Sequence, residues 1–500
     1  MTNRPSLPSE RNQSLWMANT TFPEYPTLDR DIEADVVVVG SGITGLTTAR
    51  LLGDRGLRVV VLEARRVCEG VTGFTTAKVT ALHSTIYSRL SQIWGEEVAA
   101  IYADANQAGI GKIKEIVAGD EIDCDLAEAA AVTYAESADN LAAIEAEVEA
   151  ATKAGLDAYF TTDTDLPFEI AGAVKVDRQA RFHPRRYCRG LAETITREGG
   201  LIFEASPGLE VQGSTVATPL ARARGQTVVV ATQIPFLLRG GHFARTRPSR
   251  SYALALRGTH SVEDMHISVD EPTRSVRSTG DGYLIVGGEG HPVGTDDNTA
   301  GRYRALEDWG RERFPGAEVE FRWSAQDYLS ADRLPFVGRI SKGSERVLVA
   351  TGFAKWGMTN ATAAAMIIAD HITGQPNPWA ETFDASRLAL AEGGVDTLKA
   401  NLQVAQHFVG DRIKSFAQKS LDDLVPGQGD VVMLNGKMVA GYRDEAGELH
   451  TVSARCTHLG CQVTFNRAER SWDCPCHGSR FDIDGRVLQG PAVNDLDRKG

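Results

Sequence analysis

The sequence predicts a two-part fold, in which a large α/β domain with an inserted α+β lobe is followed by a small all-β module. Three observations lead to this prediction. Short apolar runs such as Val36–Val39 and 228–231 alternate with helical stretches, as in parallel strands buried on both faces. A G-x-G-x-x-G loop directly follows the first run. After residue 421 the predicted strands become short and are separated by glycines.

Composition limits the classes of function. A chain of 500 residues is too long for one core, because cores stop growing at roughly 250 to 300 residues. The net charge of -13 would repel a phosphate backbone, so we expect no nucleic-acid partner. No apolar run is long enough to span a membrane and the N-terminus is polar, so we expect no membrane span and a cytoplasmic protein.

Composition shifts mark the expected domain boundaries. Prolines interrupt the first 34 residues and recur after residue 374. In the proposed lobe, residues 93–117 and 141–155 are expected to be amphipathic helices, and 252–257 and 283–287 strands. The boundaries are an N-terminal arm over 1–34, the α/β domain over 35–373, a linker over 374–420 and the all-β module over 421–500; within the α/β domain the dinucleotide-binding parts cover about 35–90, 180–235 and 335–373, and the substrate lobe about 91–179 and 236–334.

The glycine loop predicts a dinucleotide site. Gly40 allows a tight turn, Gly42 lets the backbone approach a pyrophosphate, and Gly45 lets the following helix pack closely on the strand. Glu63 ends the next predicted strand, at the spacing of a carboxylate that accepts both ribose hydroxyls. This pattern alone does not separate FAD from NAD. A second glycine cluster, 288–294, is one residue too long and contains Pro292, so we interpret it as a hairpin loop.

Four further stretches point to flavin. They are a Gly/Thr loop over 69–78, His183-Pro184 before a helix, the strand end at 228–232, and 347–357 followed by a helix from Asn360. With the glycine loop, they make residues 35–373 resemble the D-amino acid oxidase family of FAD-dependent oxidoreductases, which includes glycine and sarcosine oxidases. The last helix is apt, because its positive N-terminus stabilises the negative charge of reduced flavin.

The resemblance implies which residues contact FAD and substrate. The family oxidises C–N bonds of amines and amino acids, and no catalytic base can be named here. Lys78, His83, Tyr252 and Arg333 are candidate pocket residues, although each could be solvated or structural, and Lys355 is a candidate for stabilising reduced flavin or a surface lysine. The expected FAD contacts are Gly40, Gly42, Ile43, Thr44, Gly45, Glu63, Ala64, Gly70, Thr75, Thr76, Thr232, Gly352, Phe353, Lys355 and Gly357.

A cysteine and histidine cluster near the C-terminus predicts a metal centre. Two cysteines and two histidines can bind zinc or a 2Fe-2S cluster. Each of the two motifs, Cys456-x-His458 and Cys474-x-x-His477, supplies one cysteine and one histidine. Structural zinc sites instead usually pair two cysteines in a C-x-x-C knuckle. The pattern therefore favours iron and sulfur. It resembles the Rieske family over about 421–498.

That resemblance implies the ligands and a disulfide. In the Rieske family two cysteines bind one iron and two histidines the other, which assigns Cys456 and Cys474 to one iron and His458 and His477 to the other. Cys461 and Cys476 match the cysteines that form a disulfide in the cytochrome bc-type branch. In that branch a serine at the position of Ser479 donates to cluster sulfur, and a tyrosine stands where this chain has Phe481. A loop at 490–492 resembles the loop that covers the cluster.

Together the halves resemble bacterial fusion proteins of a D-amino acid oxidase-like domain with a C-terminal Rieske domain. The expected fold is thus a Rossmann-like FAD-binding α/β domain with an inserted substrate lobe, followed by an all-β Rieske domain. The expected activity is dehydrogenation of a small amine or amino acid, with single electrons passing through the 2Fe-2S cluster to an acceptor protein or quinone. The alternatives are a redox carrier or sensor reduced by NAD(P)H or a ferredoxin, and a flavin hydroxylase. The single dinucleotide loop argues against a built-in nicotinamide site.

Overall fold

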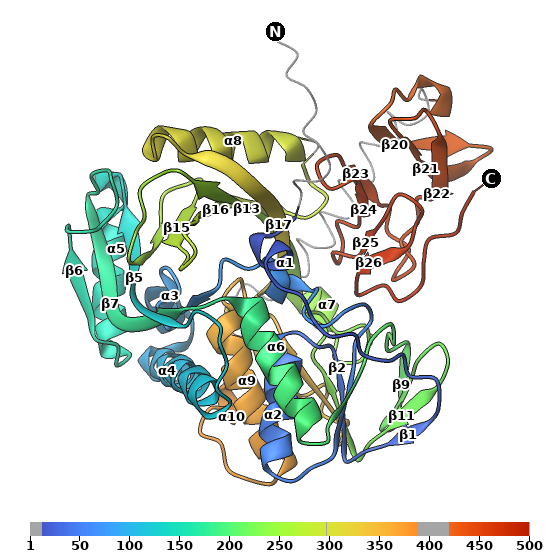
Figure 1. The fold of residues 1–500 in the computed structure, drawn as a ribbon, viewed down its shortest axis with the longest axis horizontal. Coiled ribbons are helices and arrows are strands. Elements are labelled where there is room, and N and C mark those ends of the chain that lie inside the picture. Colours follow the sequence, from blue (N-terminus) through green and yellow to red (C-terminus); the bar gives the residue numbers. More distant parts are fainter. Residues whose placement is uncertain (1–12, 297, 388–419, 500) are drawn as a thin grey trace.

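The computed structural model describes residues 13–296, 298–387 and 420–499. Two large sheets form the body of the described chain, and two small sheets form the C-terminal module beside it (Figure 1). The predicted linker lies largely outside the described residues, which within it are 374–387 and 420.

A six-stranded sheet carries the dinucleotide loop. Its strand order is β18-β19-β12-β2-β3-β8, with every pairing parallel except β18 with β19. Helices α2, α6 and α9 cover one face, and a four-stranded sheet of order β1-β11-β10-β9 covers the other. The bounds are β2 Val36–Val39, β3 Val59–Leu62, β8 Leu201–Phe203, β12 Thr227–Val230, β18 Phe336–Arg339, β19 Val347–Thr351, α2 Ile43–Asp54, α6 Pro184–Arg197, α9 Gly357–Ile372, β1 Ile32–Glu33, β9 Glu210–Gln212, β10 Thr215–Ala217 and β11 Arg222–Arg224.

A nine-stranded sheet forms the second lobe. Its path is β17-β13-β16-β15-β14-β5-β7-β4, and β6 pairs with β7. Helix α8 packs on β13 and β16, while α3, α4 and α5 form a separate group of helices. The bounds are β4 Lys78–Val79, β5 Ala127–Ala135, β6 Ala158–Thr161, β7 Gly172–Arg181, β13 Thr246–Arg257, β14 Met265–Ser268, β15 Arg274–Ser278, β16 Leu284–Pro292, β17 Glu318–Ser330, α3 Ile86–Trp94, α4 Glu96–Gly119, α5 Leu141–Lys153 and α8 Thr299–Arg313.

The C-terminal module consists of two small antiparallel sheets. One has the order β20-β21-β22 and the other β23-β24-β25-β26. A separate core that contains Trp472 and Phe481 lies within the module. The bounds are β20 Gln428–Leu434, β21 Lys437–Arg443, β22 Leu449–Ser453, β23 Thr464–Asn466, β24 Ser471–Asp473, β25 Arg480–Phe481 and β26 Val487–Gln489.

Short elements fill in the ends of the domains. In the N-terminal arm, α1 (Leu15–Ala18) buries Leu15 and Trp16 against the loop before β4. Helix α7 (His242–Arg245) precedes β13, and α10 (Ala380–Phe383) packs near β18. The arm is therefore folded onto the larger domain from Ser14 onward.

Two predicted local structures are wrong. The glycine cluster expected to be a hairpin loop lies mostly in β16, where Gly288 pairs with both Tyr252 and Arg274. Central strands tolerate glycine where something packs closely on them, so a glycine run does not by itself mark a turn. The helix expected from Asn360 begins earlier, at Gly357.

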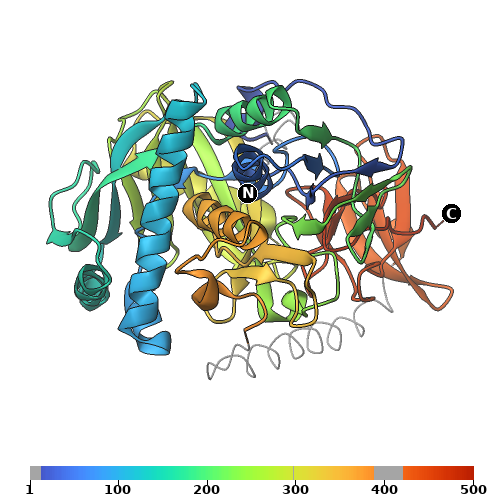
Figure 2. The same ribbon diagram turned by 90° about the horizontal axis from the view of Figure 1, so that it is seen from below.

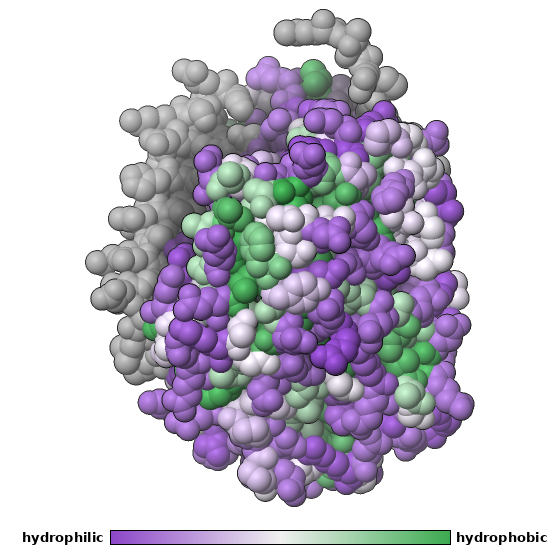
Figure 3. Space-filling view, turned by 90° about the vertical axis from the view of Figure 1, so that its left-hand side faces the viewer, coloured by the Kyte–Doolittle hydropathy of each residue, from purple (hydrophilic) through white to green (hydrophobic). Residues whose placement is uncertain are grey.

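The module and the far end of the second lobe lie at opposite ends of the molecule. Figures 1 and 2 show β5, β7 and α5 at one end and the C-terminal module at the other. The face seen in Figure 3 is mainly hydrophilic with separate apolar patches. Among the described residues, every helix falls short of the length and apolar character that crossing a membrane requires.

Candidate cofactor sites and the surface between them

The first glycine loop has the close packing that its sequence predicts. Gly40 has φ +104°, and a Cβ there would lie 2.5 Å from the carbonyl oxygen of Ala231. A Cβ on Gly45 would lie 1.9 Å from the carbonyl oxygen of Gly40. Neither position can hold a side chain, so α2 starts directly against the end of β2. The Ile43 amide donates to the Thr72 hydroxyl at 3.2 Å, and the N-cap residue Gly42 supplies no side-chain hydrogen bond, which leaves the other N–H groups of the first turn of α2 to bind a phosphate.

Glu63 is held at the end of β3. Its Oε2 accepts hydrogen bonds from the Ser41 amide at 3.0 Å and the Ser41 hydroxyl at 2.7 Å, and its Oε1 accepts from the Arg65 amide at 3.0 Å. A carboxylate has about four acceptor sites, so capacity remains for a ribose hydroxyl.

The Gly/Thr loop is fixed by two tryptophans from distant elements. The Trp16 indole donates to the Thr75 carbonyl at 2.7 Å, and the Trp323 indole donates to the Phe74 carbonyl at 2.8 Å. The Thr75 hydroxyl accepts from the Ala77 amide at 3.0 Å. The loop is thereby clamped between the N-terminal arm and β17.

Four of the expected FAD contacts lie at one edge of the six-stranded sheet. Gly40, Glu63, Thr232 and Gly352 each follow the carboxyl end of a strand, and those four strands are parallel. The carboxyl ends of parallel strands in such sheets form the binding crevice. These residues fit a dinucleotide such as FAD, since the crevice combines a glycine loop, a helix N-terminus and a fixed carboxylate.

Lys355 lies beside a half-buried carboxylate. Its amide donates to Asp327 Oδ2 at 2.7 Å, and burial raises the pKa of Asp327 to about 6. The Lys355 side chain is exposed, and desolvation by the surrounding protein lowers its pKa. A Cβ on Gly290 would lie 3.0 Å from Lys355 Nζ, so the Lys355 side chain reaches β16.

Lys78 is a buried cation without a carboxylate partner among the described contacts. Its Nζ hydrogen-bonds to the Ser275 hydroxyl. Burial, and then the charge of Arg277, lower the pKa of Lys78 to about 7. Thr76 faces Gly287 of β16, next to Ser275. Lys78 therefore lies where the Gly/Thr loop meets β15 and β16.

The other three pocket candidates are placed differently. His83 is buried, with Nδ1 2.7 Å from the Tyr102 hydroxyl and Nε2 2.7 Å from the Thr80 carbonyl, and burial lowers its pKa to about 3. Tyr252 packs in the core under α8, with its hydroxyl 3.0 Å from His291 Nε2. Arg333 follows β17, and its pKa is lowered by burial and by neighbouring arginines. The contacts of His83 and Tyr252 are those of structural residues.

The four predicted cluster ligands come together as two pairs. The Cys456 and Cys474 thiols are within hydrogen-bonding distance, and the His458 and His477 ring centroids are 5.0 Å apart. The hydrogen bond with Cys474, and then those from the His458 amide and the Ser479 hydroxyl, lower the pKa of Cys456 to about 7 although burial opposes this. Cysteines pair with cysteines and histidines with histidines, as a Rieske cluster requires.

The histidine pair also fits a metal. Both ring nitrogens of His458 are buried and have no hydrogen-bond partner in the described part of the chain. A buried polar atom without a partner is costly, and a metal bond would satisfy one of these nitrogens. Cys461 and Cys476 form a disulfide, so their sulfurs, although close to Cys474, are not free to bind iron.

The module packs against the larger domain through its cluster loops. The Tyr328 hydroxyl donates to the His477 carbonyl at 3.0 Å, and Gln326 Nε2 donates to the Gly478 carbonyl at 2.7 Å. Directly before Cys474, Asp473 forms a buried ion pair with Arg250 of β13 at 3.8 Å. Sequence reasoning missed these contacts, and the only signal was a run of polar residues, 326–328, inside a buried strand.

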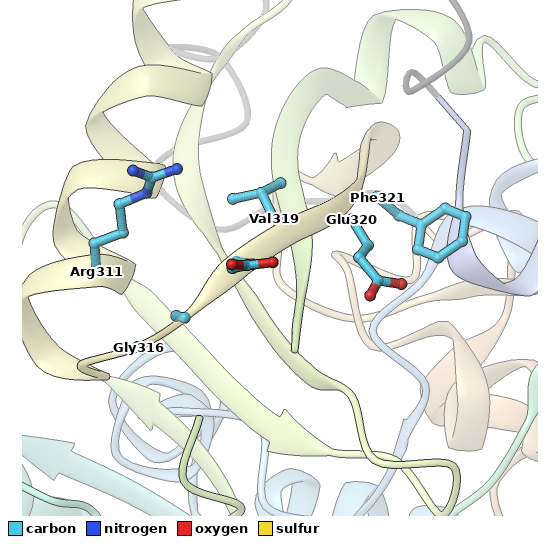
Figure 4. A pocket seen from close by; sticks show the side chains of 7 residues that line it. Arg311, Gly316, Val319, Glu320 and Phe321 are labelled. Carbon is cyan, nitrogen blue, oxygen red and sulfur yellow. The ribbon is translucent and has the colours of Figure 1, made fainter. Parts of the chain in front are cut away.

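A surface hollow of about 680 Å³ lies elsewhere. Figure 4 shows it between the end of α8 and the start of β17, with Arg311 and Glu320 at its rim. The residues that contact the cluster loops lie in the second half of β17. This open hollow is therefore separate from both candidate cofactor sites.

Comparisons with known proteins agree with these two sites. The profile of the family described as FAD dependent oxidoreductase matches residues 35–371, and that of the Rieske [2Fe-2S] domain matches 415–498. YhfW of Bacillus subtilis, named as a Rieske 2Fe-2S iron-sulfur protein, is 36% identical over 496 residues that cover 97% of each chain.

Two more relatives match the larger domain. Gamma-glutamylputrescine oxidoreductase of Escherichia coli is 27% identical over 405 residues, covering 75% of this chain and 92% of its own. Glycine oxidase from Geobacillus kaustophilus has a TM-score of 0.62 at 17% identity, covering 71% of this chain and 99% of its own. The similarity to the glycine oxidase structure shows only that the two proteins share a fold.

Proposed function

The chain belongs to the family of FAD dependent oxidoreductases and carries a C-terminal Rieske [2Fe-2S] domain, and from this premise we propose that it oxidises a C–N bond of a small amine or amino acid and delivers single electrons to an outside acceptor. The acceptor is a one-electron protein or a quinone. The name of the Escherichia coli relative, which specifies an amine substrate, supports this substrate class.

Two ionisable side chains beside the loops expected to contact flavin suit such a substrate. When bound, FAD accepts a hydride and the cluster carries one electron at a time. Lys78 with a pKa of about 7 is partly charged at neutral pH and can attract a substrate carboxylate. Asp327 lies beside Lys355 and has its pKa raised to about 6, so at neutral pH it is mostly ionised and can accept a proton. The family likeness implies no required base, since hydride transfer from a neutral amine does not need one.

One observation carries the coupling of the two sites. Tyr328 accepts a hydrogen bond from the Ala354 amide at 3.1 Å through its carbonyl and donates one to the His477 carbonyl at 3.0 Å through its hydroxyl. Ala354 belongs to the loop expected to contact flavin, and His477 is a predicted cluster ligand. A single residue thus joins the two candidate cofactor sites, which supports electron transfer inside the molecule.

Anaerobic titration with amino acids and N-methyl amines tests the proposal. Flavin absorbance and the EPR signal of the reduced cluster are recorded together. We expect flavin bleaching followed by a Rieske signal. Reduction by NAD(P)H with no response to any amine would instead identify a redox carrier.

A further inference from the structure

Tyr328 is fully buried between the two domains. Its hydroxyl lies 3.0 Å from the His477 carbonyl and 3.3 Å from the Gly490 carbonyl, so it contacts both a ligand loop and the loop expected to cover the cluster. Gln326 Nε2 lies 3.2 Å from the same hydroxyl and donates to the Gly478 carbonyl. One strand, β17, therefore holds three backbone carbonyls of the cluster loops.

The fit of the cluster loops against β17 leaves no spare room. Gly478 has φ +79°, and a Cβ there would lie 2.5 Å from Gln326 Nε2 and 2.7 Å from the Tyr328 hydroxyl. Phe243 of α7 meets the rings of His458 and His477 edge-on, at centroid distances of 5.5 and 5.0 Å. The histidine side of the module thus faces the larger domain. We call Phe243, Gln326 and Tyr328 the docking surface.

Polar contacts beside the cluster loops anchor the same arrangement. The Arg250–Asp473 ion pair is almost wholly buried, and the Tyr303 hydroxyl donates to Glu469 at 2.9 Å. The Gln489 side chain donates to Gln233, the neighbour of the expected FAD contact Thr232, at 2.5 Å. Buried polar groups paired across a boundary fix one relative orientation, because any other leaves them without partners.

We propose that Tyr328 is a positioning residue, which holds the histidine side of the cluster against the flavin domain for one-electron transfer. This inference rests on the proposed function. In each transfer one electron leaves the reduced flavin and reduces one ferric iron to ferrous, and the outside one-electron acceptor must reoxidise the cluster before the second transfer. Because the docking surface covers the histidine side, that acceptor approaches the module from another face.

Amide hydrogen exchange of the full-length protein with both cofactors bound tests the contact itself. The variant is Tyr328→Phe, which keeps the ring and removes the hydroxyl. We expect faster exchange in 477–480 and 490–492. The matched control is Tyr283→Phe, whose hydroxyl donates to Glu320 at 2.8 Å within the larger domain, and which should leave those segments unchanged. Unchanged exchange in Tyr328→Phe would overturn the inference.

Transfer itself is measured by reducing the flavin with a light flash and following the cluster absorbance. We expect Tyr328→Phe to slow cluster reduction about tenfold, since the lost hydrogen bond weakens docking. The spectra and reduction potentials of both centres should stay the same, which a purely structural defect would not allow. Phe243→Leu, a second variant of the docking surface, should also slow the reduction of the cluster.

The outcomes separate the two proposals. Equal transfer rates in the wild type and in Tyr328→Phe would overturn the positioning role and leave the proposed function standing. No transfer in the wild type would overturn internal electron transfer and, with it, the role of Tyr328. Rapid transfer after a flash but no reduction by any amine would overturn only the substrate part of the proposed function.

Discussion

At the residue scale, Phe481 offers a direct way to tune the cluster. The side chain is fully buried in the same core as Cys456 and Cys474. The Rieske resemblance places a tyrosine here in high-potential members, where its hydroxyl donates to a ligand sulfur. A donor to sulfur stabilises the reduced cluster, which carries more negative charge. We expect Phe481→Tyr to raise the reduction potential by about 60 mV, the one-electron equivalent of a tenfold change.

Protein-film voltammetry of the holoprotein measures this shift. Phe465→Tyr is the control, because Phe465 stacks on Tyr442 at 5.2 Å in the same module and should leave the potential unchanged. An unaltered potential in Phe481→Tyr would contradict the expectation, as would an equal shift in both variants.

Lys78 gives a second prediction, in the pH dependence of stability. Its pKa falls from 10.5 to about 7 on folding, so the folded protein binds fewer protons than the unfolded chain between these values. The resulting penalty is complete below pH 7 and disappears as the pH rises toward 10.5. Lys78→Met removes the penalty, and we expect it to stabilise the protein at pH 6 by on the order of 3 kcal/mol, with a smaller gain at pH 9.

Thermal midpoints at pH 6 and pH 9 provide the measurement. Lys175→Met is the control, because Lys175 is paired with Asp264 at 2.7 Å and its pKa is raised. That variant should show no gain at either pH. A gain for Lys78→Met that did not shrink at pH 9 would rule out charge burial as its cause.

At the scale of elements, a buried glutamate joins two helices of the second lobe. Glu147 of α5 is fully buried, and its oxygens accept from the amides of Tyr87 at 2.9 Å and Ser88 at 2.8 Å. These amides lie in the first turn of α3, whose N-cap residue offers no side-chain hydrogen bond. Glu147→Ala leaves one buried and one half-buried amide unpaired, so we expect a loss of about 2 to 4 kcal/mol.

Denaturant unfolding at pH 8 tests this, since burial raises the pKa of Glu147 to about 7 and the carboxylate dominates above that value. Glu149→Ala on the same helix is the control. Its side chain is 71% exposed, so the loss should be below about 0.5 kcal/mol. Similar losses in both variants would contradict the capping role.

Elements with a strong local pattern could be predicted from the sequence. The strands of the six-stranded sheet read as apolar runs because both of their faces are buried, and the glycine loop sits where β2 ends. The cysteine and histidine spacing is equally local. The prediction for β16 was wrong, because the sequence does not distinguish a glycine required by close packing in a strand from a glycine required by a turn.

Positions fixed by tertiary packing could not be predicted. Tyr252 is a pocket candidate from the sequence, yet in the structure it faces α8. A register shift between Arg250 and Tyr252 changes which side chains point to each side of β13. The role of Tyr328 and Gln326 depends on hydrogen bonds to loops about 150 residues later in the chain. The hydrophobic periodicity of a strand gives no information about such a distant contact.

At the scale of the whole molecule, the Arg250–Asp473 ion pair couples the two domains. Removing one partner of a buried pair leaves an uncompensated charge, although Arg480 also contacts Asp473 at 3.1 Å. We expect Arg250→Met to cost on the order of 2 kcal/mol and to lower the temperature at which the visible absorbance of the cluster is lost. Arg257→Met, on the same strand but paired with Glu320 at the surface, should have little effect.

A double-mutant cycle separates coupling between the domains from damage to one of them. Arg250→Met acts on β13 and Asp473→Asn acts on β24, so each alone breaks the same pair from a different domain. If the pair couples the domains, the double variant must lose the cluster at a temperature well above that expected from adding the two single effects. Strict additivity would mean that the ion pair does not couple the domains, and the docking surface, with the Tyr303–Glu469 and Gln489–Gln233 contacts, would then have to carry the whole orientation.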